Sequence, residues 1–251
     1  MAEKHEDDVE GGIRPVDAAT LIIVDADAGE PRILMGQRRP DLAFMPGKYV
    51  FPGGRVDQTD KDIAVGADLG AGEVEKLLLD MKGHPSALRA RALAVAAVRE
   101  AFEEAGLIIG CPDPAGACTA PDGTDWMKFL ATGFAPSLAP LTYFARAITP
   151  PGRPRRFDTR FFCCDIAAVA HRVESIDGEL SGLDWFTVEA MRALDLPSIT
   201  RVIVEDLGDR LALGPLGPSD AAIPYYHQRH GTFKRELLRR AAPATARPAL
   251  A

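Results

Sequence analysis

The stretch "REAFEEAGL", residues 99–107, decides how this sequence of 251 residues is interpreted. The residues before it are rich in alanine, and Gly106 is a typical residue at which a helix ends, so a helix is predicted over Leu88–Ala105. At 100° per residue, three carboxylates share one face of that helix. They are Glu100, Glu103 and Glu104.

The other side of this helix is apolar, with Val95, Val98, Phe102 and Ala105. Acids opposite an apolar stripe are also what an ordinary solvent-exposed helix shows. However, like charges at i, i+4 repel, and the helix dipole disfavours acids in the last turn. A divalent cation would offset both penalties, because Mg²⁺ prefers oxygen ligands. The pattern therefore indicates either a solvated face or a metal site.

Arg99, Glu100, Glu103, Glu104 and Gly106 resemble the second half of the Nudix box. Five fixed positions match by chance about once per million starting points. The stretch "FPGG" (51–54) resembles the start of the first half of the box, with Gly54 as its leading glycine. The acid expected six residues later is Asp60. The two halves are separated by an insertion of about 31 residues. This excess leaves open whether Asp60 still reaches Arg99.

A split box of this kind is similar to that of Nudix proteins related to the mammalian peroxisomal coenzyme A diphosphatase. The resemblance extends to "FMPGKYVFPGG" (44–54), "RRFDTRFF" (155–162) and "GELSGLDWF" (178–186). It implies an α/β fold, in which an α/β/α sandwich surrounds a mixed β-sheet and a helical insertion interrupts the box. The order of short strands, hairpins and helices favours the same mixed sheet over a Rossmann fold.

The resemblance implies divalent-metal-dependent hydrolysis of the diphosphate in a nucleoside diphosphate-linked compound, with coenzyme A or acyl-coenzyme A as the expected substrate. Mg²⁺ or Mn²⁺ would neutralise the diphosphate while an activated water attacks phosphorus. By position, the metal ligands would be Glu100, Glu103 and Glu104. The implied catalytic residues are Glu103, Glu104, Arg99 and Glu179. Glu174 and Asp158 are alternative loop acids outside the box, and for all three outside acids an ordinary loop position is the competing interpretation.

Several residues are expected to contact the substrate. Gly53 and Gly54 would let the backbone approach phosphates. Arg38 or Arg39 should face the cleft by strand alternation. A third group is the basic loop, which is either a solvated hairpin tip or a site for a substrate phosphate, with Arg156 as the candidate residue. The loop comprises Arg153, Arg155, Arg156 and Arg160. Three of the five histidines, His171, His227 and His230, are interpreted as structural or surface groups.

Composition limits the partners. The net charge is −7, so a broad nucleic-acid or anionic-membrane surface is not expected. The N-terminus lacks the apolar region of a signal peptide, and the four cysteines show no Cys-x-x-Cys pair, which favours reduced thiols in the cytoplasm. The expected partner is a small molecule, and a homodimer is left open.

The expected organisation is a disordered segment at 1–12, a single domain at 13–217 with a helical insertion at 61–87, and a C-terminal extension at 218–251 with a mobile tail. Three alternative functions stay open: a non-hydrolytic nucleotide-sensing module, a diphosphatase for ADP-ribose or NADH, and a scaffold without a ligand. The intact acids favour the enzyme over the two non-enzymatic alternatives.

Overall fold

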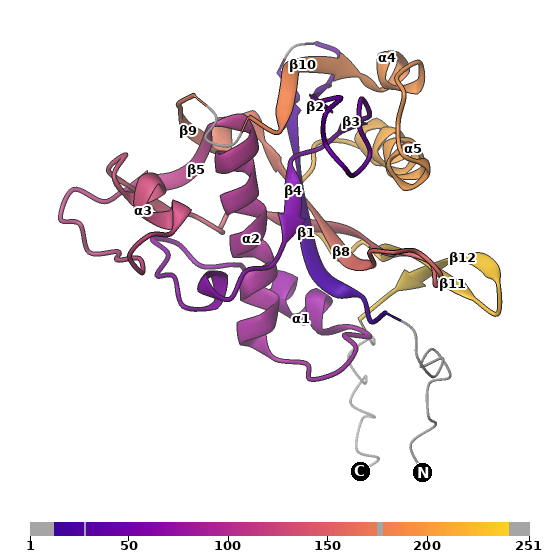
Figure 1. Cartoon of the computed structure of the whole chain (residues 1–251), viewed down its shortest axis with the longest axis horizontal. Helices are drawn as coiled ribbons and strands as arrows, with labels where there is room; N and C mark the ends of the chain where they lie inside the picture. Colours follow the sequence, from indigo (N-terminus) through magenta and orange to yellow (C-terminus); the bar gives the residue numbers. More distant parts are fainter. Residues whose placement is uncertain (1–12, 28, 175–177, 241–251) are drawn as a thin grey trace, which may run out of the picture.

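A large mixed β-sheet with helices on both faces forms the centre of the molecule (Figure 1). The computed structural model describes residues 13–27, 29–174 and 178–240. In this part of the chain the sheet has the order β10-β2-β1-β8-β7-β11-β12, while β3 pairs with β2 and β4 pairs with β1. Its strands are β1 (Val16–Asp25), β2 (Arg32–Arg38), β3 (Tyr49–Val50), β4 (Gly53–Arg55), β7 (Thr142–Ile148), β8 (Phe157–Asp165), β10 (Leu180–Thr187), β11 (Ile223–Arg229) and β12 (Thr232–Leu238).

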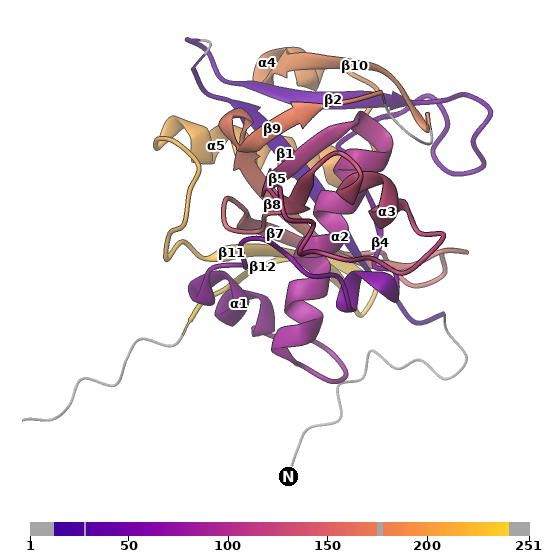
Figure 2. The ribbon, with the colours of Figure 1, turned by 90° about the vertical axis from the view of Figure 1, so that its left-hand side faces the viewer.

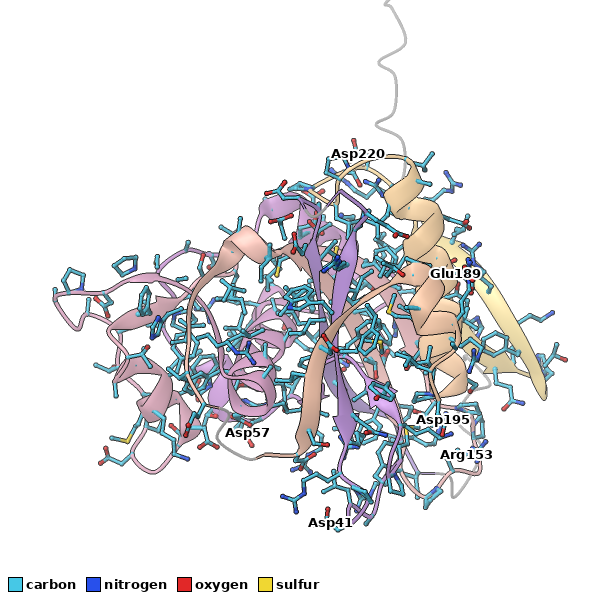
Figure 3. All side chains as sticks on the ribbon, turned by 90° about the horizontal axis from the view of Figure 1, so that it is seen from above. Asp41, Asp57, Arg153, Glu189, Asp195 and Asp220 are labelled. Atoms are coloured by element: carbon cyan, nitrogen blue, oxygen red, sulfur yellow. The ribbon has the colours of Figure 1, made fainter. Side chains whose placement is uncertain are left out.

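The helices lie on opposite sides of this sheet, and Figure 3 shows Asp57 on the α2 side and Glu189 on the α5 side. A smaller sheet of order β6-β5-β9 lies at the end of α2 (Figure 2). Within the described ranges, none of the helices combines the length and apolarity needed to cross a membrane. The remaining elements are α1 (Ala71–Leu78), α2 (Ala87–Ala105), β5 (Leu107–Pro112), α3 (Asp125–Leu130), β6 (Phe134–Pro136), β9 (Val169–Arg172), α4 (Val188–Arg192) and α5 (Ser198–Ala212).

Strand β1 explains why the sheet is covered twice. Leu21 and Ile23 belong to the apolar core beneath α2, whereas Ile22 and Val24 belong to the core beneath α5. Successive side chains of a strand point to opposite faces, so a continuous apolar run indicates burial on both sides. This arrangement confirms the predicted α/β fold with a mixed sheet.

The pairing of β1 brings the glycine loop to the centre of the sheet. One edge of β1 pairs in parallel with β8 along its whole length. The other edge pairs antiparallel with β4, where Ala19 opposes Gly54, and further along with β2, where Val24 opposes Ile33. Helix α2 contacts both β1 and β4. The two halves of the split motif are therefore neighbours in space.

The segment 61–87 was predicted to be mostly helical, but its helical part is confined to α1, apart from the single turn at its start. Glycines at 66, 70 and 83 and Pro85 interrupt the remainder, as expected from their helix-breaking character. Ala67 forms an isolated bridge with Ser137, outside the central sheet. Helix α1 packs into the core through Leu77, which is 1% exposed.

The C-terminal region differs from the prediction, which ended the domain at 217 and assigned no structure to 218–251. Strands β11 and β12 form a hairpin, and β11 pairs in parallel with β7. The missed signals are the alternation in "IPYYHQR" and the turn at His230–Gly231, where both residues have positive φ. The predicted disordered N-terminus (1–12) and mobile tail (241–251) lie outside the described residues.

Candidate active site

Helix α2 carries the acidic residues of the site, and local sequence sets both of its ends. The side chain of Ser86 accepts a hydrogen bond from the backbone N–H of Arg89 at 3.1 Å, a typical N-cap. Gly106 ends the helix in the left-handed conformation, with φ of 67°. A Cβ there would overlap the carbonyl of Val173. The glycine therefore both ends the helix and lets strand β9 approach it.

The split motif closes through a buried ion pair between Asp60 and Arg99. Asp60 is fully buried, and its two oxygens accept from Arg99 Nε at 2.9 Å and Nη2 at 3.1 Å. They also accept from Trp126 Nε1 at 3.0 Å and the backbone N–H of Asp57 at 2.8 Å. The insertion does not separate these two residues, so the question left open by the spacing is settled by direct contact.

Arg99 connects this buried carboxylate to the acidic face of α2. Its Nη1 lies 3.0 Å from Glu100 Oε1 and 3.1 Å from Glu103 Oε2, and its Nη2 donates to the carbonyl of Arg55 at 2.8 Å. Burial alone would lower the pKa of Arg99, but the surrounding carboxylates, Asp60 foremost, raise it above its usual value. Arg99 therefore stays charged and fixes the geometry between the glycine loop and the helix.

The glycine loop lies directly against two of the helix acids. The backbone N–H of Gly53 donates to Glu104 Oε2 at 2.9 Å. A Cβ at Gly54 would overlap the Glu100 carboxylate, so only glycine permits this approach. Burial raises the pKa of Glu100 to about 7, against the opposing effect of Arg99. The predicted residues Gly53 and Gly54 are thus brought to the acids of α2.

Arg38 joins the box to an acid outside it. Its guanidinium lies 3.9 Å from Glu104 and 3.1 Å from Glu179, and its Nε donates to the carbonyl of Phe44 at 2.9 Å. The Glu179 side chain is 41% exposed, whereas that of Glu104 is 3% exposed. Of the acids considered outside the box, Glu179 is therefore at the site and open to solvent.

The other predicted acids occupy different surroundings. Glu174 follows strand β9, and its backbone lies beside Gly106 at the end of the box. Asp158 is not a loop acid, because it is buried in β8 and accepts from both Nε and Nη2 of Arg146. Burial opposes ionisation, but Arg146 and Arg160 hold the pKa of Asp158 below its usual value. Asp158 is therefore a structural ion-pair partner.

The basic loop divides into buried and exposed residues. Arg160 was predicted to face the substrate, but it is fully buried, and its Nη1 contacts Asp158 Oδ1 at 2.8 Å. Alternation along β8 explains this, since residues 158 and 160 point to the same face, under α2. Arg156 donates to the carbonyls of Thr149 at 3.1 Å and Ile13 at 2.8 Å, and none of its described contacts is with the box.

Trp126 is a site residue that the sequence did not reveal. It lies in α3, is fully buried, and holds Asp60 through its indole N–H. The short helix was predicted, but nothing in its pattern pointed to a residue 66 positions earlier.

Arg39, the alternative to Arg38, is exposed and contacts Asp41 at 3.0 Å. His171 stacks on the ring of Phe134, and His227 stacks on the ring of Tyr225.

The donors around the glycine loop match a hard divalent cation in type, because they are carboxylate and backbone oxygens. The overlap that a Cβ at Gly54 would produce shows that the Glu100 carboxylate lies directly against the glycine backbone. Across 13–27, 29–174 and 178–240, however, no three carboxylate, imidazole or thiol groups converge as a metal-binding cluster. Arg99 and Arg38 hold the acids instead. Metal binding would therefore require the glutamate side chains to turn from these arginines toward the cation.

Comparisons with known proteins agree with this geometry. No protein-family model matches the chain. It is 32% identical over 162 residues to a putative nudix hydrolase 7 of Caenorhabditis elegans, a match that covers 61% of this chain and 46% of that protein. The chain therefore spans less than half the length of this curated relative.

A crystal structure of a NUDIX hydrolase from Alicyclobacillus acidocaldarius superposes with a TM-score of 0.57 and 26% identity. The superposition covers 82% of this chain and 99% of the bacterial one. It thus extends over nearly the whole of that hydrolase. In sequence and in fold, the chain is therefore similar to Nudix hydrolases.

Proposed function

We propose that this chain is a Nudix diphosphatase that hydrolyses the phosphoanhydride of a nucleoside diphosphate-linked compound with Mg²⁺ or Mn²⁺. One observation carries the proposal. The Asp60–Arg99 pair draws both halves of the box together, so Gly53 and Gly54 lie against the acids of α2 despite the insertion. A helix used only for packing would not need a glycine backbone held against its carboxylates.

Three carboxylates would hold the metal: Glu100, Glu103 and Glu104. When bound, the cation would neutralise the diphosphate and polarise its oxygens. Glu179 is exposed and joined to Glu104 through Arg38, and on this basis we assign it the role of accepting a proton from an attacking water. Arg38, once released from these acids by the cation, would be free to bind a phosphate oxygen. Arg99 keeps the box acids in position rather than contacting substrate.

The proposed substrate is coenzyme A or an acyl derivative, with ADP-ribose and NADH as the competing compounds. Coenzyme A carries a 3′-phosphate that needs an additional cation. Arg160 is excluded by its burial, so the candidates are Arg153, Arg155 and Arg156 on the loop before β8. This loop adjoins the segment that Arg38 binds, because Phe157 packs edge-on against Phe44 with ring centroids 6.1 Å apart.

The four cysteines are free thiols, and we place the enzyme in the cytoplasm.

The test is product formation from coenzyme A, dephospho-coenzyme A, ADP-ribose and NADH, each with Mg²⁺, Mn²⁺ or a chelator. Turnover by the wild type should require metal and fall by orders of magnitude in Glu103→Gln and in Glu104→Gln. Glu30→Gln, at an exposed residue of the β1–β2 turn, is the matched control and should be unchanged. Calorimetric Mn²⁺ titration provides a second readout, since both box variants should bind the ion more weakly.

Two results would separate the alternatives. Tight binding of a nucleotide with no turnover under any metal would identify a sensing module. Full activity in both box variants would show that these acids do not hold the metal, whatever the substrate.

A further inference from the structure

Strand β12 forms one edge of the central sheet. Among the described residues it pairs with β11 alone, and six of its seven residues are exposed (Figure 1). A strand at an edge presents unpaired backbone groups that can accept another strand. Phe233 is 55% exposed and Leu237 is 43% exposed, an unusual exposure for two large apolar residues on one short strand.

The hairpin turn fixes which backbone groups point outward. Residues 230 and 231 form a two-residue connection in which both φ angles are positive, so Arg229 and Thr232 make a hydrogen-bonded pair. Along an antiparallel pair, hydrogen-bonded and non-hydrogen-bonded positions alternate. The N–H and C=O groups of Phe233, Arg235 and Leu237 therefore point away from β11 and toward the free edge.

The sequence of β12, "TFKRELL", is complementary to itself about its central residue. If a second copy pairs antiparallel with Arg235 opposite Arg235, then Phe233 lies opposite Leu237 and Lys234 lies opposite Glu236. Each of these contacts occurs twice by symmetry. The outward-pointing groups then form about six backbone hydrogen bonds, in the same register that the side chains require.

The one unfavourable pair in this register is Arg235 with its symmetry copy. Its charge is already balanced within each chain, because Nη2 lies 3.0 Å from Asp206 and Nε donates to the hydroxyl of Tyr226 at 2.9 Å. The oppositely charged Lys234 and Glu236 occupy non-hydrogen-bonded positions, where facing side chains approach most closely. In this register the attractive Lys234–Glu236 pairs lie where the two strands are closest. Arg235, whose charge is balanced within its own chain, lies on the two-fold axis.

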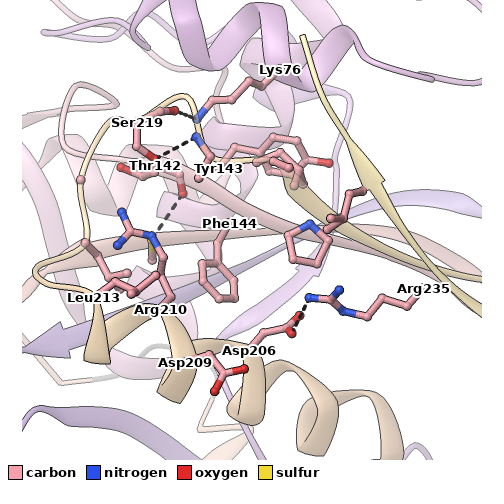
Figure 4. A pocket seen from close by; sticks show the side chains of 18 residues that line it. Lys76, Thr142, Tyr143, Phe144, Asp206, Asp209, Arg210, Leu213, Ser219 and Arg235 are labelled. Carbon is pink, nitrogen blue, oxygen red and sulfur yellow. Dashed lines mark hydrogen bonds and ion pairs between the residues drawn. The ribbon is translucent and has the colours of Figure 1, made fainter.

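A pocket beside β12 enlarges the surface that a second copy would cover. It has a volume of about 230 Å³ and is lined by Leu213, Leu216, Leu237 and Arg235, among others (Figure 4). Leu213 is 83% exposed at its rim. A two-fold axis perpendicular to the sheet keeps residues 233 and 237 on the same face, so Phe233 of the second copy would lie beside Leu237, next to this pocket.

From these observations we infer that two copies of this chain form a symmetric dimer by antiparallel pairing of their β12 strands, centred on Arg235. The pairing joins two central sheets into one continuous sheet. The acids of α2 lie beside β4 and β2, which β8, β7 and β11 separate from β12 in the sheet, so the pairing does not cover them. The dimer is therefore independent of the proposed hydrolytic activity.

Charge exchange tests the pairing directly, by sedimentation equilibrium of the full chain. The wild type should be a dimer. Lys234→Glu and Glu236→Lys each turn two attractive contacts into two repulsive ones, and each should raise the dimer Kd by about tenfold or more. The double variant Lys234→Glu/Glu236→Lys restores both contacts and should recover the wild-type Kd. Circular dichroism and thermal melting check that each variant is folded.

A cysteine at the axis tests the register. Arg235→Cys places two thiols on residues about 5.5 Å apart at their Cα atoms, within disulfide reach, and oxidation should give a covalent dimer on a non-reducing gel. Lys234→Cys is the matched control and should not cross-link above the wild-type background. A wild type that is monomeric at every concentration, a double variant that stays as weak as the single ones, or cross-linking at 234 instead of 235 would overturn the inference.

Discussion

Asp60→Asn is the most informative single change, because it removes one charge from the contact that closes the box. Oδ1 accepts from Arg99 Nε and Trp126 Nε1, while Oδ2 accepts from Arg99 Nη2 and the N–H of Asp57. An asparagine must place its NH₂ group against two of these donors in either orientation. Neither orientation restores the hydrogen bonds, so the substitution is nearly isosteric but cannot be accommodated.

The expected cost follows from the burial of both partners. Asp60 is fully buried and the Arg99 side chain is 11% exposed. Breaking such a pair from one side costs about 3–5 kcal/mol, because it leaves a buried charge without its counterion. For a chain of this size each kcal/mol lowers the melting temperature by about 2–4 °C, so a decrease of roughly 6–20 °C is expected. Glu100 and Glu103 remain beside Arg99, which favours the lower part of that range.

Chemical denaturation is the assay, with Asp62→Asn as the matched control. Asp62 is exposed and two residues away, so its substitution should change the free energy of unfolding by less than about 0.5 kcal/mol. Asp60→Asn should lower the denaturation midpoint without changing the slope m. A loss below about 1 kcal/mol would refute the view that this buried pair holds the two halves of the box together.

Three further predictions concern the loop, the insertion and the substrate. Gly54→Ala should abolish most activity by displacing the Glu100 carboxylate, whereas Gly217→Ala, where a Cβ meets nothing within 4 Å, should not; equal activities would argue against a tight approach at Gly54. Leu77→Ala in α1 should destabilise the fold by about 2–5 kcal/mol, as measured by denaturation, because the leucine is buried in the main core; a neutral result would make the insertion a detachable appendage. The kcat/KM for coenzyme A should exceed that for dephospho-coenzyme A by at least about tenfold, and Arg155→Ala should reduce this ratio; equal rates for both compounds would exclude a 3′-phosphate contact.

The sequence predicted what depends on local periodicity. The 3.6-residue repeat placed Glu100, Glu103 and Glu104 on one face of a helix, and Gly106 marked its end. The Asp60–Arg99 contact was not predictable, because a 39-residue separation says nothing about which route the chain takes back. Contacts of this range depend on the packing of the whole insertion rather than on its local pattern.

Two features of the strands differ from the predictions. Arg160 was grouped with its loop neighbours by composition, although alternation within "FDTRFF" already paired it with Asp158 on one face. The hairpin at 223–238 is difficult to predict because its edge strand carries charges at three adjacent positions, as a solvated tail also does. Charge alternation on an exposed strand and on a mobile tail look alike until a turn is recognised between two such runs.

The additional residues of the box do more than lengthen a loop. Helix α2 begins at Ala87, twelve residues before Arg99, so part of the inserted length extends the helix toward its N-terminus. There Arg89 forms a two-pronged contact with Asp17 at the start of β1, at 2.5 and 2.8 Å. Helix α2 is thus fixed to the start of β1 through Arg89 and to the buried Asp60 through Arg99, at two points that both precede the acids along the helix. Because closing a longer loop costs little more entropy than closing a short one, two charged anchors are enough to hold the helix in place across the insertion.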